Sequence, residues 1–566
     1  MKHLGRNDMT QRFTMRHSIS LAASFAVVLQ PGLRAQQPAP QTPQTAPTVN
    51  GGHVSTPGSS QATRNPDGTY TIQTSTRIVI LDVVATDAKG NMVSGLSKSD
   101  FHVTEAGDAQ TITNFEVGES RLPDPSLDIE STADLDRLAP RAPVNIILLD
   151  EFNTLFEDMA FARDSLKKFL QHQPEHLITP TMLIAVSLDK FDVLHDYTQN
   201  KQALIDSLDH HFSGSPWRNT SNSWASERYG TAFLTLRRVA EAVTGHQGRK
   251  NMIWIGRGFP SINLADVPLD SSNRINTYRQ DCVNSLRDAR VTLTTIDPAG
   301  LMVDPGVYGA AAAFNDPFGG NYQFAKIAQA TGGRTIYGRN DVDAQIGAAA
   351  LEGIHFYTLV YHPTNTSNDP SKFRKIVVTV DRPGVTLSTR QGYYLSYGPG
   401  RVDPKAPSRR LMSDLASAED SNMSYDGVDM AVTPVPGTPL SYVIHVAARS
   451  VGWYFPTATE PFRHTELVLA VTTYDRKGKL LKQSANDMKF KAPENASPTG
   501  RIEVPLNFPF KLDPDSKAVR ARVVVRLGTS GRIGTADLDL TKPPVIVTAT
   551  PSTTGPAITN PQPSTP

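Results

Sequence analysis

Residues 144–154 read VNIILLDEFNT, an apolar run that ends at Asp150 and continues into polar residues. A run of this length, apolar on both faces and bounded by polar residues, is typical of a strand buried on both sides. Apolar residues then recur at helical spacing, at Met159, Ala162, Leu166 and Phe169. A buried strand followed directly by an amphipathic helix is the building unit of an α/β domain.

The same alternation continues along the chain and predicts one large domain over 140–397. Further strands are predicted at 182–188, 252–255, 291–296 and 355–361, with helices between them. This order predicts a doubly wound, mostly parallel sheet covered by helices on both faces. Segments 373–380 and 385–389 are predicted to form an antiparallel hairpin that closes the domain.

Two β regions are predicted to flank this domain. An N-terminal β module is expected over 70–120, and a C-terminal β-sandwich-like domain over 410–548, because short alternating strands are separated there by turn residues. Residues 36–69 and 549–566 are rich in Pro, Thr, Ser and Gly and are predicted to form a disordered linker and a disordered tail.

The first 35 residues have the pattern of an export signal. Lys2, Arg6, Arg12 and Arg16 precede the apolar stretch 19–29, and Ala35 offers a cleavage point. A buried N-terminal helix is the alternative, which the polar segment after residue 35 disfavours. No later stretch has the apolar length of a membrane helix. We therefore expect an exported protein, periplasmic or secreted, with no transmembrane anchor.

Composition limits the kinds of partner and site. The chain has 566 residues and a formal net charge of +1, which does not favour nucleic acid. Cys282 is the single cysteine, so the sequence excludes an intrachain disulfide and a cysteine-based zinc site.

A series of segments in this sequence resembles von Willebrand factor type A domains, and more narrowly the related proteins of acidobacteria. The segments are VVATDAKGNMVSGLSKSDFHVTEAGDAQTITNFE at 83–116, IILLDEFNT at 146–154, TTIDPAGL at 294–301, IAQATGGRTIYGRNDVDAQI at 327–346, FYTLVYHP at 356–363 and FRKIVVTVDRPGVTLSTRQGYY at 373–394. The resemblance covers residues 76–394 and implies the fold and an exported location. It leaves the biochemical role open.

The resemblance also implies a place for a Mg²⁺ or Ca²⁺ ion at the carboxyl end of the sheet. The family's ligands are Asp-x-Ser-x-Ser after the first strand, with a Thr and an Asp from later loops. Asp150, Thr154 and Thr231 match, but Phe152 replaces a serine, and Arg257 stands where an Asp is expected. A degenerate site with no bound cofactor is therefore predicted. The alternative role for Asp150 is pairing with Arg257 or capping the next helix.

The same end of the sheet is predicted to bind a partner. Segment 213–229 carries Trp217 and Trp224 in a Ser/Asn-rich stretch, and 298–321 is a second long loop. Long loops inside a compact domain are commonly functional, and aromatic side chains often anchor interfaces. Asn153 and Arg257 are expected on this face too. In the alternative interpretation both tryptophans fold back onto the domain.

Enzyme signatures are absent from the sequence: it has no Gly-x-Ser-x-Gly, His-Glu-x-x-His or Walker motif. His172 and His176 have helical spacing, but Pro174 lies between them, and His210 and His211 are predicted on a helix surface. The favoured hypothesis is a non-enzymatic binding or adhesion module for a protein or glycan of the cell envelope. A hydrolase with an unrecognised site and a structural assembly component are the alternatives. The oligomeric state is not predicted.

Overall fold

The computed structural model describes residues 61–64, 70–73, 78–188, 190–212, 222–258, 279, 281–300, 324–364, 372–394, 406–453, 462–493, 506–515, 517–528 and 530–541. The predicted signal peptide and tail lie outside these residues. β1 (Gln61–Arg64), which lies within the predicted linker, pairs antiparallel with β2 (Tyr70–Gln73), which follows it.

A mixed, mainly parallel sheet forms the centre of an α/β domain. It has six strands in the order β12-β11-β10-β7-β8-β9, and only the β8–β9 pair is antiparallel. The strands are β7 (Val144–Asp150), β8 (His176–Val186), β9 (Phe191–Asn200), β10 (Lys250–Ile255), β11 (Val291–Ile296) and β12 (Thr335–Ile336). The sequence analysis missed the edge strand β9.

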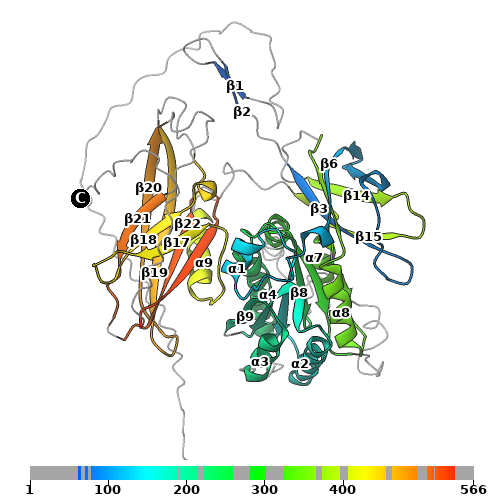
Figure 1. Cartoon of the computed structure of the whole chain (residues 1–566), viewed down its shortest axis with the longest axis horizontal. Coiled ribbons are helices and arrows are strands. Elements are labelled where there is room, and N and C mark those ends of the chain that lie inside the picture. The colour runs from blue at the N-terminus through cyan, green and yellow to red at the C-terminus, as the bar shows by residue number, and fades with distance from the viewer. Residues whose placement is uncertain are drawn as a thin grey trace, which may run out of the picture. The chain divides into compact units, whose positions relative to one another are not determined.

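Helices pack on both faces of this sheet (Figure 1). Side chains of β7 alternate, so that Ile147 and Leu149 join one buried cluster while Ile146 and Leu148 join the other. The first cluster includes side chains of α2 (Phe156–Gln171), α3 (Lys201–His210) and α8 (Val342–Glu352). The second includes side chains of α4 (Asn222–Ala242), the helix at 281–288 and α7 (Phe324–Ala330).

The N-terminal β module and the predicted last part of the α/β domain form one β-sandwich. Its two sheets have the orders β15-β3-β13-β6 and β16-β14-β4-β5. The strands are β3 (Val79–Thr86), β4 (Phe101–Glu105), β5 (Asp108–Gln110), β6 (Ile112–Val117), β13 (Tyr357–Tyr361), β14 (Phe373–Val380), β15 (Thr386–Ser388) and β16 (Gly392–Tyr394).

Two predictions about this region were therefore wrong. The strand at 355–361 does not extend the parallel sheet, because β13 lies between β3 and β6 and is antiparallel to both. The predicted hairpin of 373–380 with 385–389 does not form, because β14 pairs with β4 and β15 pairs with β3. Local alternation indicates a strand but not its partner, and here Leu81, Phe101 and Leu359 are buried in one common core.

A buried carboxylate joins several strands inside the sandwich. Glu105 at the end of β4 is fully buried and forms an ion pair with Arg374 of β14 at 3.1 Å. Its other oxygen, Oε2, accepts a hydrogen bond from the Tyr361 hydroxyl at 2.7 Å, and the Tyr393 hydroxyl lies 3.1 Å from Oε1 as a further donor. A satisfied buried network of this kind fixes the pairing of the strands it connects.

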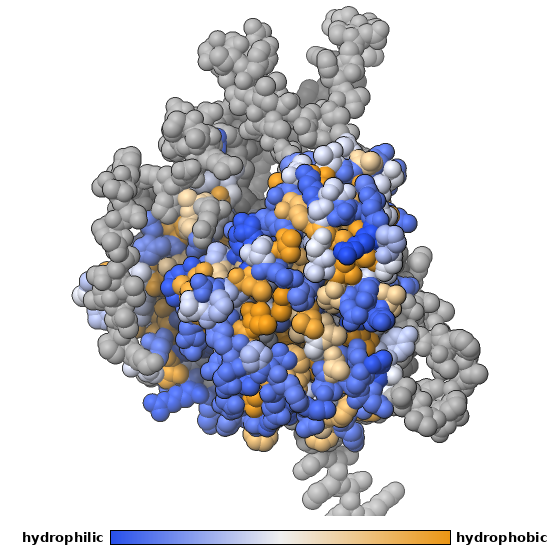
Figure 2. Space-filling model, turned by 45° about the vertical axis from the view of Figure 1, so that its right-hand side comes forward, coloured by the Kyte–Doolittle hydropathy of each residue, from blue (hydrophilic) through white to orange (hydrophobic). Residues whose placement is uncertain are grey.

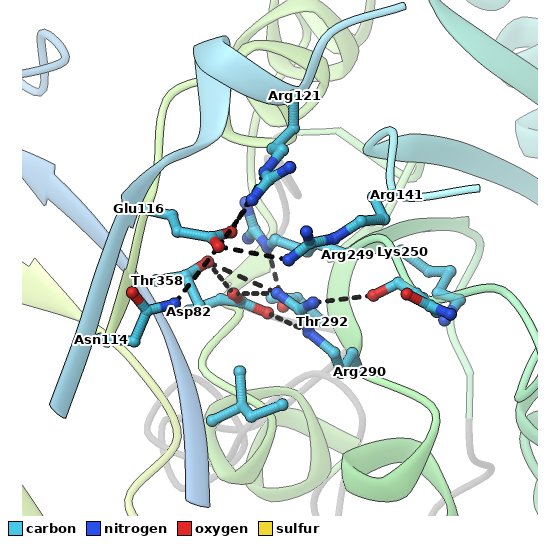
Figure 3. A network of polar contacts seen from close by, with 12 residues as sticks. Asp82, Asn114, Glu116, Arg121, Arg141, Arg249, Lys250, Arg290, Thr292 and Thr358 are labelled. Atoms are coloured by element: carbon cyan, nitrogen blue, oxygen red, sulfur yellow. Dashed lines mark hydrogen bonds and ion pairs between the residues drawn. The ribbon is translucent and has the colours of Figure 1, made fainter. Parts of the chain in front are cut away.

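Ion pairs connect the sandwich to the α/β domain (Figure 3). Asp82 of β3 faces Arg290, the residue before β11, and the two side chains are 2.6 Å apart. Glu116 of β6 accepts hydrogen bonds from Arg121 at 2.6 Å and from Arg141, which precedes β7, at 3.2 Å. The sandwich therefore contacts the amino ends of the parallel strands and leaves their carboxyl ends to other elements.

The C-terminal region contains α9 (Ala406–Glu419) and two antiparallel sheets, with the orders β17-β18-β21 and β20-β19-β22-β23. The strands are β17 (Met430–Pro434), β18 (Ser441–Val446), β19 (Phe462–Tyr474), β20 (Leu480–Pro493), β21 (Leu506–Lys511), β22 (Arg520–Leu527) and β23 (Ile533–Asp539). Inner residues such as Ile444, Leu469 and Val523 share one core, as the predicted β-sandwich requires.

Contacts between α4 and the C-terminal region are apolar in part, and they include the ion pair of Arg237 with Asp414 at 3.1 Å. Leu236 and Val239 of α4 belong to the same buried cluster as Leu415 of α9 and Val524 of β22.

Among the described residues, no helix is long and apolar enough to cross a membrane.

Candidate functional site

The predicted site lies where the strand order of the parallel sheet reverses, between β7 and β10. Asp150 ends β7, and Gly256, Arg257 and Gly258 follow β10 directly. Asp297 follows β11. Because the carboxyl ends of parallel strands meet at one edge, these residues come together at the position where open α/β sheets keep their ligand crevice.

The Asp150 carboxylate is fully buried and accepts hydrogen bonds on both oxygens. Oδ1 accepts from the backbone N–H of Asn153 at 2.9 Å. Oδ2 accepts from the indole N–H of Trp254 at 3.1 Å and from the backbone N–H of Gly258 at 2.8 Å. Asp150 therefore connects the loop after β7 to the loop after β10.

Burial raises the pKa of Asp150 to about 7, although the hydrogen bonds from its neighbours act to lower that pKa. A carboxylate has about four lone-pair sites. The donors that fill them are the indole of Trp254 and the backbone N–H groups of Phe152, Asn153 and Gly258. This carboxylate does not fit the role of a metal ligand, because binding a cation would displace hydrogen bonds that hold the loops.

Thr154 also joins the loop after β7 to the loop after β10. Its Oγ1 accepts a hydrogen bond from the backbone N–H of Arg257 at 3.3 Å. Gly256 makes this approach possible: it has φ +146°, and a Cβ there would lie 2.3 Å from Cβ of Asp150 and 2.7 Å from Oγ1 of Thr154. Phe152 is buried and packs edge-on against Trp254, with ring centroids 6.1 Å apart. Phe152 therefore belongs to the core.

Asn153 is held by both of its amide atoms. Its Nδ2 donates to the carbonyl of Gly258 at 2.7 Å, and its Oδ1 accepts from Arg228 of α4 at 2.9 Å. Only 5% of Asn153 is exposed, so the predicted partner-binding role is unsuited to it. Thr231, the predicted third metal ligand, lies in α4 and is half-buried. Within the described part of the chain, no group of His, Cys, Asp and Glu is arranged to hold a metal ion.

The alternative prediction that Asp150 pairs with Arg257 was wrong, because Arg257 faces two other carboxylates. Its Nη2 lies 3.6 Å from Asp158 in the first turn of α2, and its Nε lies 3.7 Å from Asp297. Both separations exceed hydrogen-bond length, and Arg257 Nε and Asp158 Oδ2 are buried atoms with no hydrogen-bond partner. Burial raises the pKa of Asp158 and of Asp297. The side chain of Arg257 is 29% exposed, so its guanidinium retains donors for a ligand.

The two tryptophans predicted to anchor a partner are not placed by the structure. Trp217 lies outside the described residues, and so does the side chain of Trp224. The predicted loop at 213–229 is in part helical, because α4 begins at Asn222 and therefore includes the backbone of Trp224. The Ser/Asn-rich composition that suggested a loop does not prevent a helix whose later turns bury Leu236 and Val239 in the core.

The sequence analysis missed an ion pair at the same end of the sheet. Glu151 Oε1 lies 2.7 Å from His211 Nε2, with only 3% and 11% of the two side chains exposed. The prediction that His211 lies on a helix surface was wrong, because α3 ends at His210 and the next residue turns inward to Glu151. Sixty residues separate the pair, so no local spacing could have indicated it.

No protein-family model matches the chain, and no curated protein matches it. Among solved structures, the chain is similar to a calcium-binding mutant of β-glucuronidase 2 from Bacteroides uniformis, at 14% identity and a TM-score of 0.12. That match covers 32% of this chain and 18% of the glucuronidase chain. A likeness at this level carries no argument about fold or function.

Proposed function

We propose that this chain is an exported binding protein of the cell envelope or its surroundings. Its α/β domain, with a doubly wound sheet like that of von Willebrand factor type A domains, holds a protein or glycan partner at the carboxyl ends of the strands. The strand order and the helices on both faces support this fold. The basic and apolar N-terminal sequence supports export.

The position and exposure of the Arg257 side chain are the main support for the proposed binding role. Its guanidinium lies at the point of strand reversal and is partly exposed, and its ion pairs with Asp158 and Asp297, the two found within the described part of the chain, are both long. Arginine is enriched among the residues that dominate binding energy at protein interfaces, because its planar donor group pairs with carboxylates and carbonyl groups at two points. We include Trp217 and Trp224 in the proposed face because α4 begins at Asn222, two residues before Trp224, and Arg228 of the same helix contacts Asn153 at this end of the sheet.

The proposed mode of recognition is through a few anchoring side chains. On the face that Figure 2 shows, groups of hydrophobic residues (orange) alternate with hydrophilic ones (blue). Interfaces formed on mixed surfaces of this kind depend on a few buried anchors surrounded by polar contacts. Magnesium and calcium have no part in this proposal. Asp150 and Thr154 already accept hydrogen bonds from the surrounding loops, and binding a metal ion would break those bonds.

Site-specific photocrosslinking in the native organism tests this proposal. A photoreactive residue at Phe156, which is 54% exposed at the start of α2, should crosslink a partner that mass spectrometry identifies. The purified partner should then bind at least about tenfold more weakly to Arg257→Ala and to the Trp217→Ala, Trp224→Ala double variant.

Arg137→Ala is the matched control, because Arg137 is exposed on α1 (Thr132–Leu138), which precedes β7 at the amino end of the sheet. This variant should bind normally. Equal binding by all of these variants, with unchanged folding, would place the interface elsewhere.

A hydrolase is the second candidate, and the buried Glu151–His211 pair favours it. A carboxylate that orients a histidine is part of many nucleophilic sites. Turnover of an ester, peptide or glycoside panel that disappears in His211→Asn would support this candidate over simple binding.

A further inference from the structure

A pocket of about 790 Å³ lies between the loop joining β8 to β9 and the end of α3. Its walls include the carboxylates of Glu151, Asp192 and Asp206, the ammonium group of Lys190, and the apolar side chains of Val193 and Phe212. This hollow lies toward the β8–β9 edge of the sheet, whereas the site around Arg257 lies at the β7–β10 reversal. It is therefore a separate candidate binding site.

Glu151 offers this pocket a carboxylate oxygen, Oε2, that accepts no hydrogen bond from the described residues. Its side chain is 3% exposed, and in the described structure its single side-chain contact joins Oε1 to His211. Oε2 therefore keeps its lone pairs at the wall of the pocket. A carboxylate oxygen that faces a pocket can accept a charge-assisted hydrogen bond, so a ligand that supplies an N–H group would be stabilised there.

The charged groups around the pocket favour one sign of charge on a ligand. Three carboxylates line the pocket with two histidines, His210 and His211, and one ammonium group, and that ammonium is already 2.5 Å from Asp192. Asp206 accepts a hydrogen bond from Gln202, a neutral donor, so its negative charge is not compensated by that contact. An anionic ligand would be repelled, and a cation would gain from each carboxylate.

We propose that this pocket binds a primary ammonium or guanidinium group carried on an aliphatic chain, as in a lysine or arginine side chain or a small diamine. Glu151 Oε2 accepts from the cationic group at the base, and Asp206 adds a second negative charge. Val193 and Phe212 contact the aliphatic part, and the Phe212 ring, which is 85% exposed, attracts the cation at the mouth.

Calorimetry on the full chain with 1,5-diaminopentane and agmatine tests this site. Both amines should bind, whereas 1,5-pentanediol and glutarate, of similar length but neutral and anionic, should not bind at the same concentrations. Glu151→Gln should weaken amine binding about tenfold, because the amide keeps the size and an acceptor for His211 but removes the charge.

Asp206→Asn should weaken binding by a smaller factor, about threefold. Asp209→Asn is the matched control: Asp209 lies on the same helix, but it pairs with Lys167 of α2 at 2.7 Å and does not line the pocket. Equal binding of diol and diamine, or unchanged affinity in folded Glu151→Gln, would overturn the assignment. Should Glu151→Gln fail to fold, unchanged affinity in both Asp206→Asn and Phe212→Ala would overturn it.

The two sources of the cation are separated in the same experiment. A Gly-Arg-Gly or Gly-Lys-Gly peptide with blocked ends that binds more tightly than the free amines assigns the ligand to a protein side chain. Tighter binding of the free diamines assigns it to a soluble amine. The proposal does not depend on the proposed partner face, because Arg257→Ala should leave amine binding unchanged.

Discussion

Arg290 and Asp82 form a two-point ion pair although 208 residues separate them in the chain. Nη2 of Arg290 lies 2.6 Å from Oδ1 of Asp82, and Nε lies 3.4 Å from Oδ2 (Figure 3). Burial acts to raise the pKa of Asp82, but Arg290, Arg249 and the Thr358 hydroxyl together outweigh burial and hold that pKa below its ordinary value. This contact joins a strand of the β-sandwich to the residue that precedes β11 of the parallel sheet.

Removing the Asp82 charge should destabilise the protein. We expect Asp82→Asn to lower the free energy of unfolding by about 3 kcal/mol, because it removes the carboxylate paired with Arg290 and one of the two carboxylates near the buried Arg249. Denaturant titration measures the change. Asp381→Asn is the control, since its pair with His102 is exposed and should contribute less than about 0.5 kcal/mol. Equal effects of the two variants would contradict the prediction.

The buried Asp150 predicts a pH dependence of stability. Its pKa rises from 3.8 to about 7 on folding, so the folded state favours the protonated carboxyl. The stability contributed by this group is complete below pH 3.8 and is lost as pH rises toward 7, a change of about 4 kcal/mol. Unfolding free energies measured across this range should fall more steeply in the wild type than in Asp150→Asn.

Asp341→Asn provides the comparison for that measurement. A hydrogen bond from Arg339 lowers the pKa of Asp341 to about 2, so its contribution is present above pH 3.8 and is lost only as pH falls toward 2. This variant should keep the wild-type slope between pH 4 and 7. A wild-type slope that survives in Asp150→Asn would show that another group titrates there.

The C-terminal region should be required for the α/β domain to stay soluble. A chain that ends at residue 405 exposes the face of α4 where Leu236 and Val239 meet Leu415 and Val524, and it removes the Asp414 partner of Arg237. We expect this truncation to aggregate or to bind a hydrophobic dye. A chain that ends at residue 541 should behave like the wild type. Wild-type stability of the shorter chain would show that the two regions fold independently.

The mature protein should begin near Gln36. The basic residues before the apolar stretch 19–29, followed by Ala35, motivate this expectation. N-terminal sequencing of protein recovered from the envelope or the medium measures the start directly. Ala35→Pro should accumulate the uncleaved precursor. Envelope material that still begins at Met1 would refute the prediction.

Local sequence predicted much of the α/β domain correctly. The runs at β7, β10 and β11 are strands with every residue buried, as their continuous apolar and β-branched composition indicated. The sequence also predicted that Asp150, Thr231 and Arg257 lie at one edge of the sheet, because residues after parallel strands must lie there. Asp150 and Arg257 do follow β7 and β10, whereas Thr231 lies inside α4. It did not predict the contacts of these residues: two of the donors to Asp150, Trp254 and Gly258, lie 104 and 108 residues away in the chain.

By itself, the sequence determined which segments form strands and helices, since apolar spacing and turn residues act over a few positions. Only the tertiary structure decided that β13 and β14 complete the N-terminal sandwich, and that His211 turns inward to Glu151. Strand pairing and buried ion pairs depend on which surfaces meet when distant segments pack. The sequence pattern indicates which side chains will be buried and will therefore need a packing or hydrogen-bonding partner. Which residue becomes that partner is determined only when the chain has packed.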